Sequence, residues 1–159
     1  MLALIQARSN SKRFKKKVLY NIYETPLICH VIKRIKKSKH VTKVVVATSK
    51  IKSDDILVRY LRSKKISVFR GDLKNVALRL SKACEKYKKL FFIRISGDSP
   101  LIDHSIIDEA IKIFKKHNKY KVDLITNVFP RKFPKGQSVE IINNITLKNN
   151  IKNMNKNQK

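Results

Sequence analysis

Apolar runs of strand length alternate with amphipathic segments along this chain. Between the runs, apolar residues recur every three to four positions, which is the spacing of one face of a helix. The pattern predicts strands at residues 2–7, 44–47, 66–69, 90–95 and 122–126, and helices at residues 26–35, 54–61, 74–88 and 104–117. Such an alternation, with continuous apolar strands, predicts an α/β fold: a three-layer α/β/α sandwich around a mainly parallel sheet.

Two of the helices have recognisable starts. Thr25 followed by Pro26 supplies an N-cap residue and a proline at the first helical position. Ser53 with Asp54 and Asp55 supplies capping side chains for the next helix. We therefore expect these residues to serve the helix ends.

The loop after the first strand is rich in cations. Its ten positions, 8–17, hold six basic residues, which are Arg8, Lys12, Arg13, Lys15, Lys16 and Lys17. Sheets of this class bind ligands outside the carboxyl ends of their strands, and a turn there directs backbone N–H groups and cations at a polyphosphate. The loop is a candidate triphosphate site, and a solvated basic loop is the alternative.

The loop after the fourth strand offers a carboxylate. Asp98 follows Gly97 and precedes Pro100, at the carboxyl end of an apolar strand. Magnesium is typically held by one or two carboxylates together with substrate phosphates and water. Asp98 is therefore a candidate Mg²⁺ ligand, and a carboxylate that merely caps the turn is the alternative.

Composition adds charge and size to this picture. The 159 residues carry 38 Lys and Arg against 11 Asp and Glu, a formal net charge of +27. The length predicts one domain. The cations are spread along the chain without interleaved aromatic residues, which argues against a dedicated nucleic-acid site. Binding to a polyanion is kept as an alternative, because Lys and Arg that neutralise phosphates drive sequence-independent binding.

Three further expectations follow from composition. No apolar run approaches the roughly 20 residues of a membrane span and no secretory signal is present, so we expect a cytoplasmic protein without membrane association. Cys29 and Cys84 lack metal-ligand spacing and are expected to be buried small hydrophobes. Residues 143–159 contain seven Asn and little periodicity, so we expect residues 1–142 to form the domain and the rest to be a frayed helix or a disordered end.

Several segments together resemble a known family, in order and at ordinary spacing. They are Ile5-Gln6-Ala7-Arg8 with Ser11, Arg13 and Lys17; Val45-Val46-Ala47-Thr48-Ser49; Val68-Phe69-Arg70-Gly71 with Arg79; the run from Arg94 through Gly97-Asp98 to Asp103; and Val139-Glu140. This set resembles the cytidylyltransferases, which include spore-coat polysaccharide synthesis proteins and the acylneuraminate and 3-deoxy-manno-octulosonate cytidylyltransferases.

The resemblance implies a nucleotide-diphospho-sugar transferase-like fold and a reaction. A sugar hydroxyl, usually the anomeric hydroxyl of an acid sugar, would attack the α-phosphate of CTP with Mg²⁺, releasing pyrophosphate and forming a CMP-sugar for a surface polysaccharide or glycan. The implied roles are nucleotide contacts by Ala7, Arg8, Ser11, Arg13, Lys17 and Arg79, catalysis by Arg8, Arg13, Lys17 and Asp98, metal binding by Asp98, and sugar binding by Glu140. A homodimer is compatible with the resemblance.

The chain also departs from the family pattern. Lys15 and Lys16 stand where Pro-Gly is common, and Asn75 stands where Asp is usual. Chains of the family run some tens of residues further, so the resemblance implies a C-terminally truncated member. These departures favour, as the alternative function, a module of the same fold that binds the nucleotide without turnover.

Overall fold

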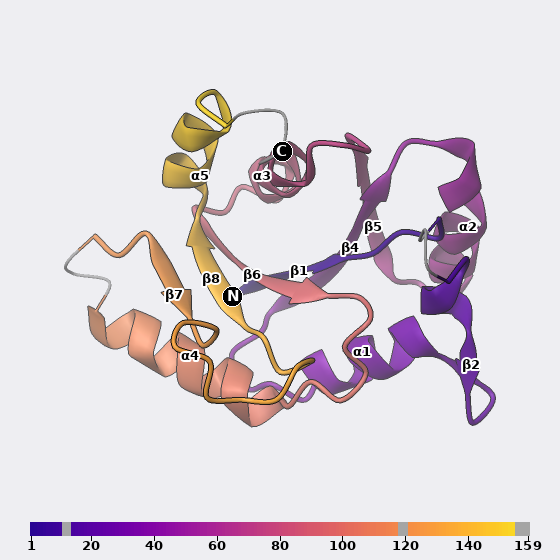
Figure 1. Ribbon diagram of the computed structural model, residues 1–159, viewed down its shortest axis with the longest axis horizontal. Coiled ribbons are helices and arrows are strands. Elements are labelled where there is room, and N and C mark those ends of the chain that lie inside the picture. The colour runs from indigo at the N-terminus through magenta and orange to yellow at the C-terminus, as the bar shows by residue number, and fades with distance from the viewer. Residues whose placement is uncertain (11–13, 118–120, 155–159) are drawn as a thin grey trace.

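A six-stranded sheet forms the centre of the protein (Figure 1). The computed structural model describes residues 1–10, 14–117 and 121–154. The strand order is β5-β4-β1-β6-β8-β7, with β1, β4, β5 and β6 parallel and β8 antiparallel to both of its neighbours. The strands are β1 (Leu2–Gln6), β4 (Lys43–Ser49), β5 (Ser67–Gly71), β6 (Phe91–Ser96), β7 (Leu124–Thr126) and β8 (Glu140–Asn143).

Helices cover both faces of this sheet. They are α1 (Leu27–Ile35), α2 (Asp55–Ser63), α3 (Val76–Lys86), α4 (His104–His117) and α5 (Asn144–Ile151). In Figure 1, α3 and α5 lie above the sheet while α1 and α4 lie below it. Within the described ranges, none of the helices is long and apolar enough to cross a membrane.

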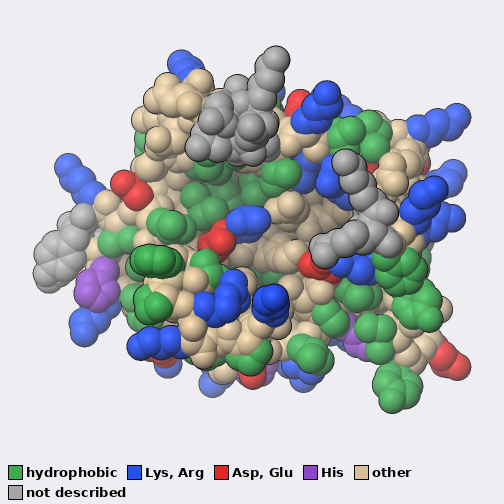
Figure 2. All heavy atoms as spheres, viewed as in Figure 1, with side chains coloured by type: hydrophobic (Ala, Val, Ile, Leu, Met, Phe, Trp, Pro, Cys, Tyr) green, Lys and Arg blue, Asp and Glu red, His purple; other side chains and the backbone are tan. Residues whose placement is uncertain are grey.

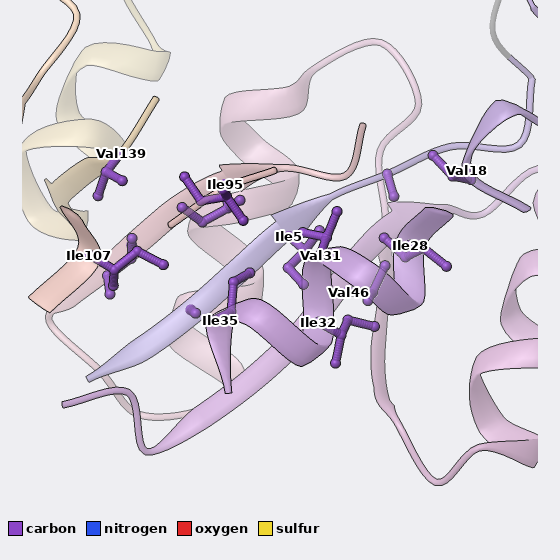
Figure 3. Close-up of a cluster of buried hydrophobic side chains, with 14 of the residues drawn as sticks. Ile5, Val18, Ile28, Val31, Ile32, Ile35, Val46, Ile95, Ile107 and Val139 are labelled. Atoms are coloured by element: carbon purple, nitrogen blue, oxygen red, sulfur yellow. The ribbon is translucent and has the colours of Figure 1, made fainter. Parts of the chain in front are cut away.

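Alternate residues of each strand feed two hydrophobic cores. Ile5 and Ile95 point to the α1 side, where they meet Val31 and the α4 residue Ile107 (Figure 3). The neighbouring residues point to the α3 side, where the buried set is Leu2, Leu4, Val45, Ala47, Leu80, Ala83, Cys84 and Phe92. Burial on both faces explains the continuous apolar strands. The predicted three-layer fold with a mainly parallel sheet is confirmed.

The antiparallel strand β8 was absent from the sequence prediction. It pairs with β6 on one side and β7 on the other, with Ile141 opposite Ile93 and Ile125. Only Ile141 and Ile142 are apolar in it, between Glu140 and Asn143, so the segment has no strand-length apolar run. The chain continues directly into α5, which the Asn143 side chain caps and which packs on α3.

One predicted helix start is wrong, and the other is right in position but not in its capping contact. Thr25 and Pro26 form β3 (Thr25–Pro26), which pairs with β2 (Asn21–Ile22), and α1 begins only at Leu27. The reversal between β2 and β3 uses positive φ angles at both Tyr23 and Glu24, as a two-residue hairpin requires. Asp54 does occupy the N-cap position of α2, at the end of a 3₁₀ turn, η2 (Lys52–Asp54), but its side chain makes no capping hydrogen bond.

The two cysteines differ in burial. Cys84 is fully buried, as predicted, and burial raises the pKa of its thiol to about 12. Cys29 is only half-buried, and its Sγ lies 3.4 Å from the Tyr60 hydroxyl. The prediction of a buried Cys29 is therefore wrong, because α1 presents this position to the Tyr60 side chain of α2 rather than to the sheet.

Candidate nucleotide site

The loops after β1 and β6 touch at the carboxyl ends of the two strands. The Gly97 amide donates to the Gln6 carbonyl at 2.8 Å. A Cβ atom at Gly97 would lie 2.7 Å from the Ala7 Cβ and 2.9 Å from the Gln6 oxygen, closer than real Cβ contacts come. Glycine at this position therefore lets the two loops approach, and with them the cationic loop and Asp98.

Asp98 lies between a hydroxyl and a cation. Its carboxylate accepts a hydrogen bond from Ser96 Oγ at 2.6 Å and forms an ion pair with Lys17 Nζ. Burial raises the pKa of Asp98, but the bonds from Lys17 and Ser96 outweigh it and hold the pKa below its usual value. With 38% of its side chain exposed, Asp98 is an accessible carboxylate that stays charged at neutral pH.

The cationic loop is closed by backbone hydrogen bonds at its ends. The Ala7 amide donates to the Ala47 carbonyl, and the Lys16 amide donates to the Ser9 carbonyl at 2.7 Å, with Lys16 in a left-handed conformation. Arg8 is exposed at the start of the loop. Ser11 and Arg13, which the resemblance assigns to the triphosphate, lie outside the described residues.

Arg79 is a fully buried guanidinium. Its Nη1 donates to the carbonyl oxygens of Asp72 at 2.5 Å and Leu73 at 3.4 Å. Its Nε and Nη2 have no acceptor in the described part of the chain. Burial lowers the pKa of Arg79, and the charge of Arg8 lowers it further. A buried cation with two unpaired donor nitrogens is costly; both nitrogens are closed to solvent, so a ligand acceptor would reach them only after the side chains over them move.

Polar side chains line the sheet face beside these loops. Arg94 of β6 pairs with Glu140 of β8 at 2.7 Å, and its Nε donates to the Gln6 side chain of β1 at 3.3 Å. Arg94 is the β6 partner of Leu4 in β1, so both side chains lie on the same face of the sheet. That face is covered by α3 nearer the amino ends of these strands. Figure 2 shows acidic and basic side chains beside a hollow near the centre of the view. We call Gln6, Arg94 and Glu140 the polar floor.

The residues present fit a metal that arrives with a nucleotide. Among the described residues, no group of three or more His, Cys, Asp or Glu side chains is placed to hold an ion. A single accessible carboxylate beside a cationic loop suits Mg²⁺, which keeps several waters and binds through one or two carboxylates plus substrate phosphates. Asp98 is that carboxylate.

Comparison with known proteins decides the family. The cytidylyltransferase family model matches residues 2–159. The chain belongs to the cytidylyltransferases. This cytidylyltransferase is 34% identical over 116 residues to the spore coat polysaccharide biosynthesis protein SpsF of Bacillus subtilis, a match that covers 70% of this chain and 48% of that protein.

Two more proteins extend the comparison. The 3-deoxy-manno-octulosonate cytidylyltransferase of Geobacter sulfurreducens is 32% identical over 111 residues, covering 69% of this chain and 43% of that protein. A cytidylyltransferase structure from Leptospira borgpetersenii serovar Hardjo-bovis superimposes with a TM-score of 0.89 at 30% identity, over 97% of this chain and 65% of that one. This cytidylyltransferase chain thus spans about half the length of the curated relatives it matches.

Proposed function

We propose that this chain transfers a cytidylyl group from CTP to a sugar hydroxyl and releases pyrophosphate. The observation that carries the proposal is the direct contact between Lys17 and Asp98 at the carboxyl ends of β1 and β6. In this proposal Lys17 is the phosphate-binding cation and Asp98 the metal-binding carboxylate, and the support is that the two lie together in a member of the cytidylyltransferase family. We extend the family's chemistry to this chain on that basis.

The loop residues have distinct tasks in this proposal. The triphosphate is held by Arg8, Ser11, Arg13 and Lys17. Arg79 donates its unpaired N–H groups to an acceptor on the nucleotide, and Ala7 also contacts the nucleotide. When the nucleotide binds, Lys17 exchanges Asp98 for a phosphate oxygen, which leaves the carboxylate for the metal. Mg²⁺ bound with CTP would neutralise charge on the phosphates. The sugar oxygen bonds to the α-phosphorus as the bond to the β-phosphate oxygen breaks, the hydroxyl proton passes to water and pyrophosphate leaves, so catalysis is mainly positioning and electrostatics.

The polar floor is the proposed sugar site. Glu140 accepts hydrogen bonds from substrate hydroxyls, and Arg94 keeps Glu140 in place. Arg94 precedes Asp98 by four residues, and at about 3.3 Å per residue along a strand a sugar can span the distance between them. The proposed substrate is an acid sugar and the proposed product serves surface polysaccharide or glycan synthesis. This is supported by the names of the Geobacter sulfurreducens and Bacillus subtilis relatives.

The proposed reaction is tested by pyrophosphate release. We expect release from CTP with Mg²⁺ and one member of a panel of acid sugars, and little release when ATP, GTP or UTP replaces CTP. Calorimetry of CTP binding is run in parallel. CTP binding without pyrophosphate release over the whole panel would instead support a nucleotide-binding module, and a steep fall of DNA or RNA affinity with salt would support the polyanion alternative.

A Glu140→Gln substitution tests the sugar site. Losing a charge-assisted hydrogen bond to the substrate is expected to raise the KM for the sugar about tenfold, with the KM for CTP within about twofold. The matched control is Glu85→Gln, because Glu85 forms a 2.7 Å ion pair with Lys148 between α3 and α5, away from the polar floor. An unchanged sugar KM in the Glu140 variant would remove Glu140 from the sugar site.

A further inference from the structure

The cationic loop is fastened to the fold by a buried carboxylate. Asp54, at the end of the 3₁₀ turn η2, has no exposed surface. Its Oδ1 accepts the backbone amide of Ser9 at 2.7 Å, 45 residues away in the sequence. Ser9, itself 3% exposed, follows Arg8 directly. The path of the chain immediately after Arg8 is therefore held on its amide side by this side chain, while the Ser9 carbonyl accepts from Lys16 within the loop.

The other oxygen of Asp54 is fixed by β4. Oδ2 accepts from Thr48 Oγ1 at 2.9 Å, from the Ser49 amide at 3.1 Å and from the Ser49 hydroxyl. Burial raises the pKa of Asp54, but these hydrogen bonds together with that from Ser9 outweigh it and lower the pKa. Asp54 is thus a charged, fully hydrogen-bonded carboxylate, which is the condition for a buried charge to be tolerated.

The segment that presents Asp54 is itself braced. Arg70 of β5 donates from Nε to the Ser49 carbonyl at 3.0 Å and from Nη2 to the Ile51 carbonyl at 3.1 Å. The same guanidinium pairs with Asp55 at 2.7 Å. These contacts hold the turn between β4 and α2, so the position of Asp54 is set before any ligand binds.

We propose that Asp54 is a positioning residue that presets the cationic loop for the triphosphate. The proposal rests on the proposed function, and it assigns to Asp54 a role that its sequence position, in front of a helix, does not suggest. Asp54 contacts no substrate in this account. It acts by fixing the Ser9 amide, so that the loop which starts at Arg8 leaves β1 in one direction.

The chemistry of the carboxylate makes the proposal testable. An ionised Asp accepts on both oxygens, whereas Asn accepts on one side and donates on the other. In Asp54→Asn the side-chain NH₂ group therefore faces either the Ser9 N–H or the Ser49 N–H, so that two donors point at each other and one hydrogen bond is lost. We expect the bond to Ser9 to be lost, because the Oδ2 side carries three of the four hydrogen bonds.

Four measurements on Asp54→Asn test this role. We expect the affinity for CTP to fall about tenfold, and the affinity for CMP to fall less than about threefold, so that the CTP-to-CMP ratio collapses. The sugar KM at saturating CTP stays unchanged. In the protein without ligand, hydrogen exchange of the Ser9 amide becomes faster by about tenfold.

The matched control is Asp108→Asn. Asp108 of α4 also holds a loop, accepting from Ser38 Oγ and the Lys39 amide, before the amino end of β4. Its substitution is expected to leave the CTP-to-CMP ratio and Ser9 exchange as in the wild type. If Asp54→Asn fails to fold, Thr48→Val replaces it, because it removes one donor to Asp54 and keeps the carboxylate. We expect the CTP-to-CMP affinity ratio and Ser9 exchange to change about threefold in the same directions.

The outcomes separate this proposal from the proposed function. Unchanged Ser9 exchange in Asp54→Asn overturns the positioning role, whether or not the wild type binds CTP. Equal losses of CTP and CMP affinity also overturn it, because they indicate a general loss of structure. Failure of the wild type to bind CTP, with faster Ser9 exchange in the variant, overturns the proposed function and leaves Asp54 as the residue that sets the loop.

Discussion

Asp98→Asn is expected to lower pyrophosphate release from CTP by about a thousandfold, which corresponds to the several kcal/mol that a bound metal contributes to stabilising transition-state charge. Asn keeps the shape and one acceptor but loses the negative charge that Mg²⁺ and Lys17 need. The ion pair with Lys17 is partly exposed, so its loss costs little stability. The measurement is kcat with saturating CTP and sugar, beside a thermal unfolding curve.

Asp103→Asn is the control for this experiment. Asp103 lies in the same loop between β6 and α4, where its carboxylate accepts from the Ser105 amide and hydroxyl. Asn is equally good at such a helix start, so activity should stay within about twofold of the wild type. Pyrophosphate release that survives in the Asp98 variant at the level of the Asp103 variant would exclude Asp98 as the metal ligand.

Arg79→Met is expected to separate stability from nucleotide binding. The guanidinium is fully buried without a carboxylate partner within hydrogen-bonding distance in the described chain, and an apolar side chain of similar volume removes that desolvation cost. Such replacements are often neutral or stabilising by about 1–4 kcal/mol. The affinity for CTP should nevertheless fall about a hundredfold, because two N–H groups would lose a ligand acceptor.

Chemical denaturation and calorimetry with CTP measure the two effects. Arg62→Met on the exposed side of α2 is the control, and it should change neither quantity. A less stable Arg79→Met protein that binds CTP as tightly as the wild type would show that Arg79 serves the fold alone.

The parallel part of the sheet was predictable from sequence because its strands, β4 above all, are largely buried and read as nearly continuous apolar runs. Val44, Val45, Val46 and Ala47 leave no polar gap, and the helices between such strands follow from their spacing. The strand β8 was not predictable in this way, since Glu140 and Asn143 flank only two apolar residues. Its place in the sheet comes from pairing with β6 and β7 rather than from its own pattern.

The candidate site also has a part that the sequence predicts and a part that it does not. Asp98 and the cationic loop were visible because both follow apolar strands, whose carboxyl ends collect ligands in parallel sheets. Asp54 has the sequence context of a helix cap, and its real partner Ser9 is remote in the chain. Arg94 gave one faint signal, a single cation inside an apolar strand, but its pairing with Glu140 required the register between β6 and β8.

The insertion of β8 between β6 and β7 also has a consequence for how the protein assembles. Strands β1, β4 and β5 are linked by successive helical crossovers and each pairs with its neighbour along the chain, whereas β6 crosses over to pair with β1, which places Asp98 beside Lys17 across 81 residues. Glu140 joins Arg94 across 46 residues, and closing loops of this length costs conformational entropy before the contacts form. Both halves of the candidate site therefore depend on late, long-range pairing: the loops meet only after β6 has joined β1, and the polar floor is complete only after β8 has joined β6.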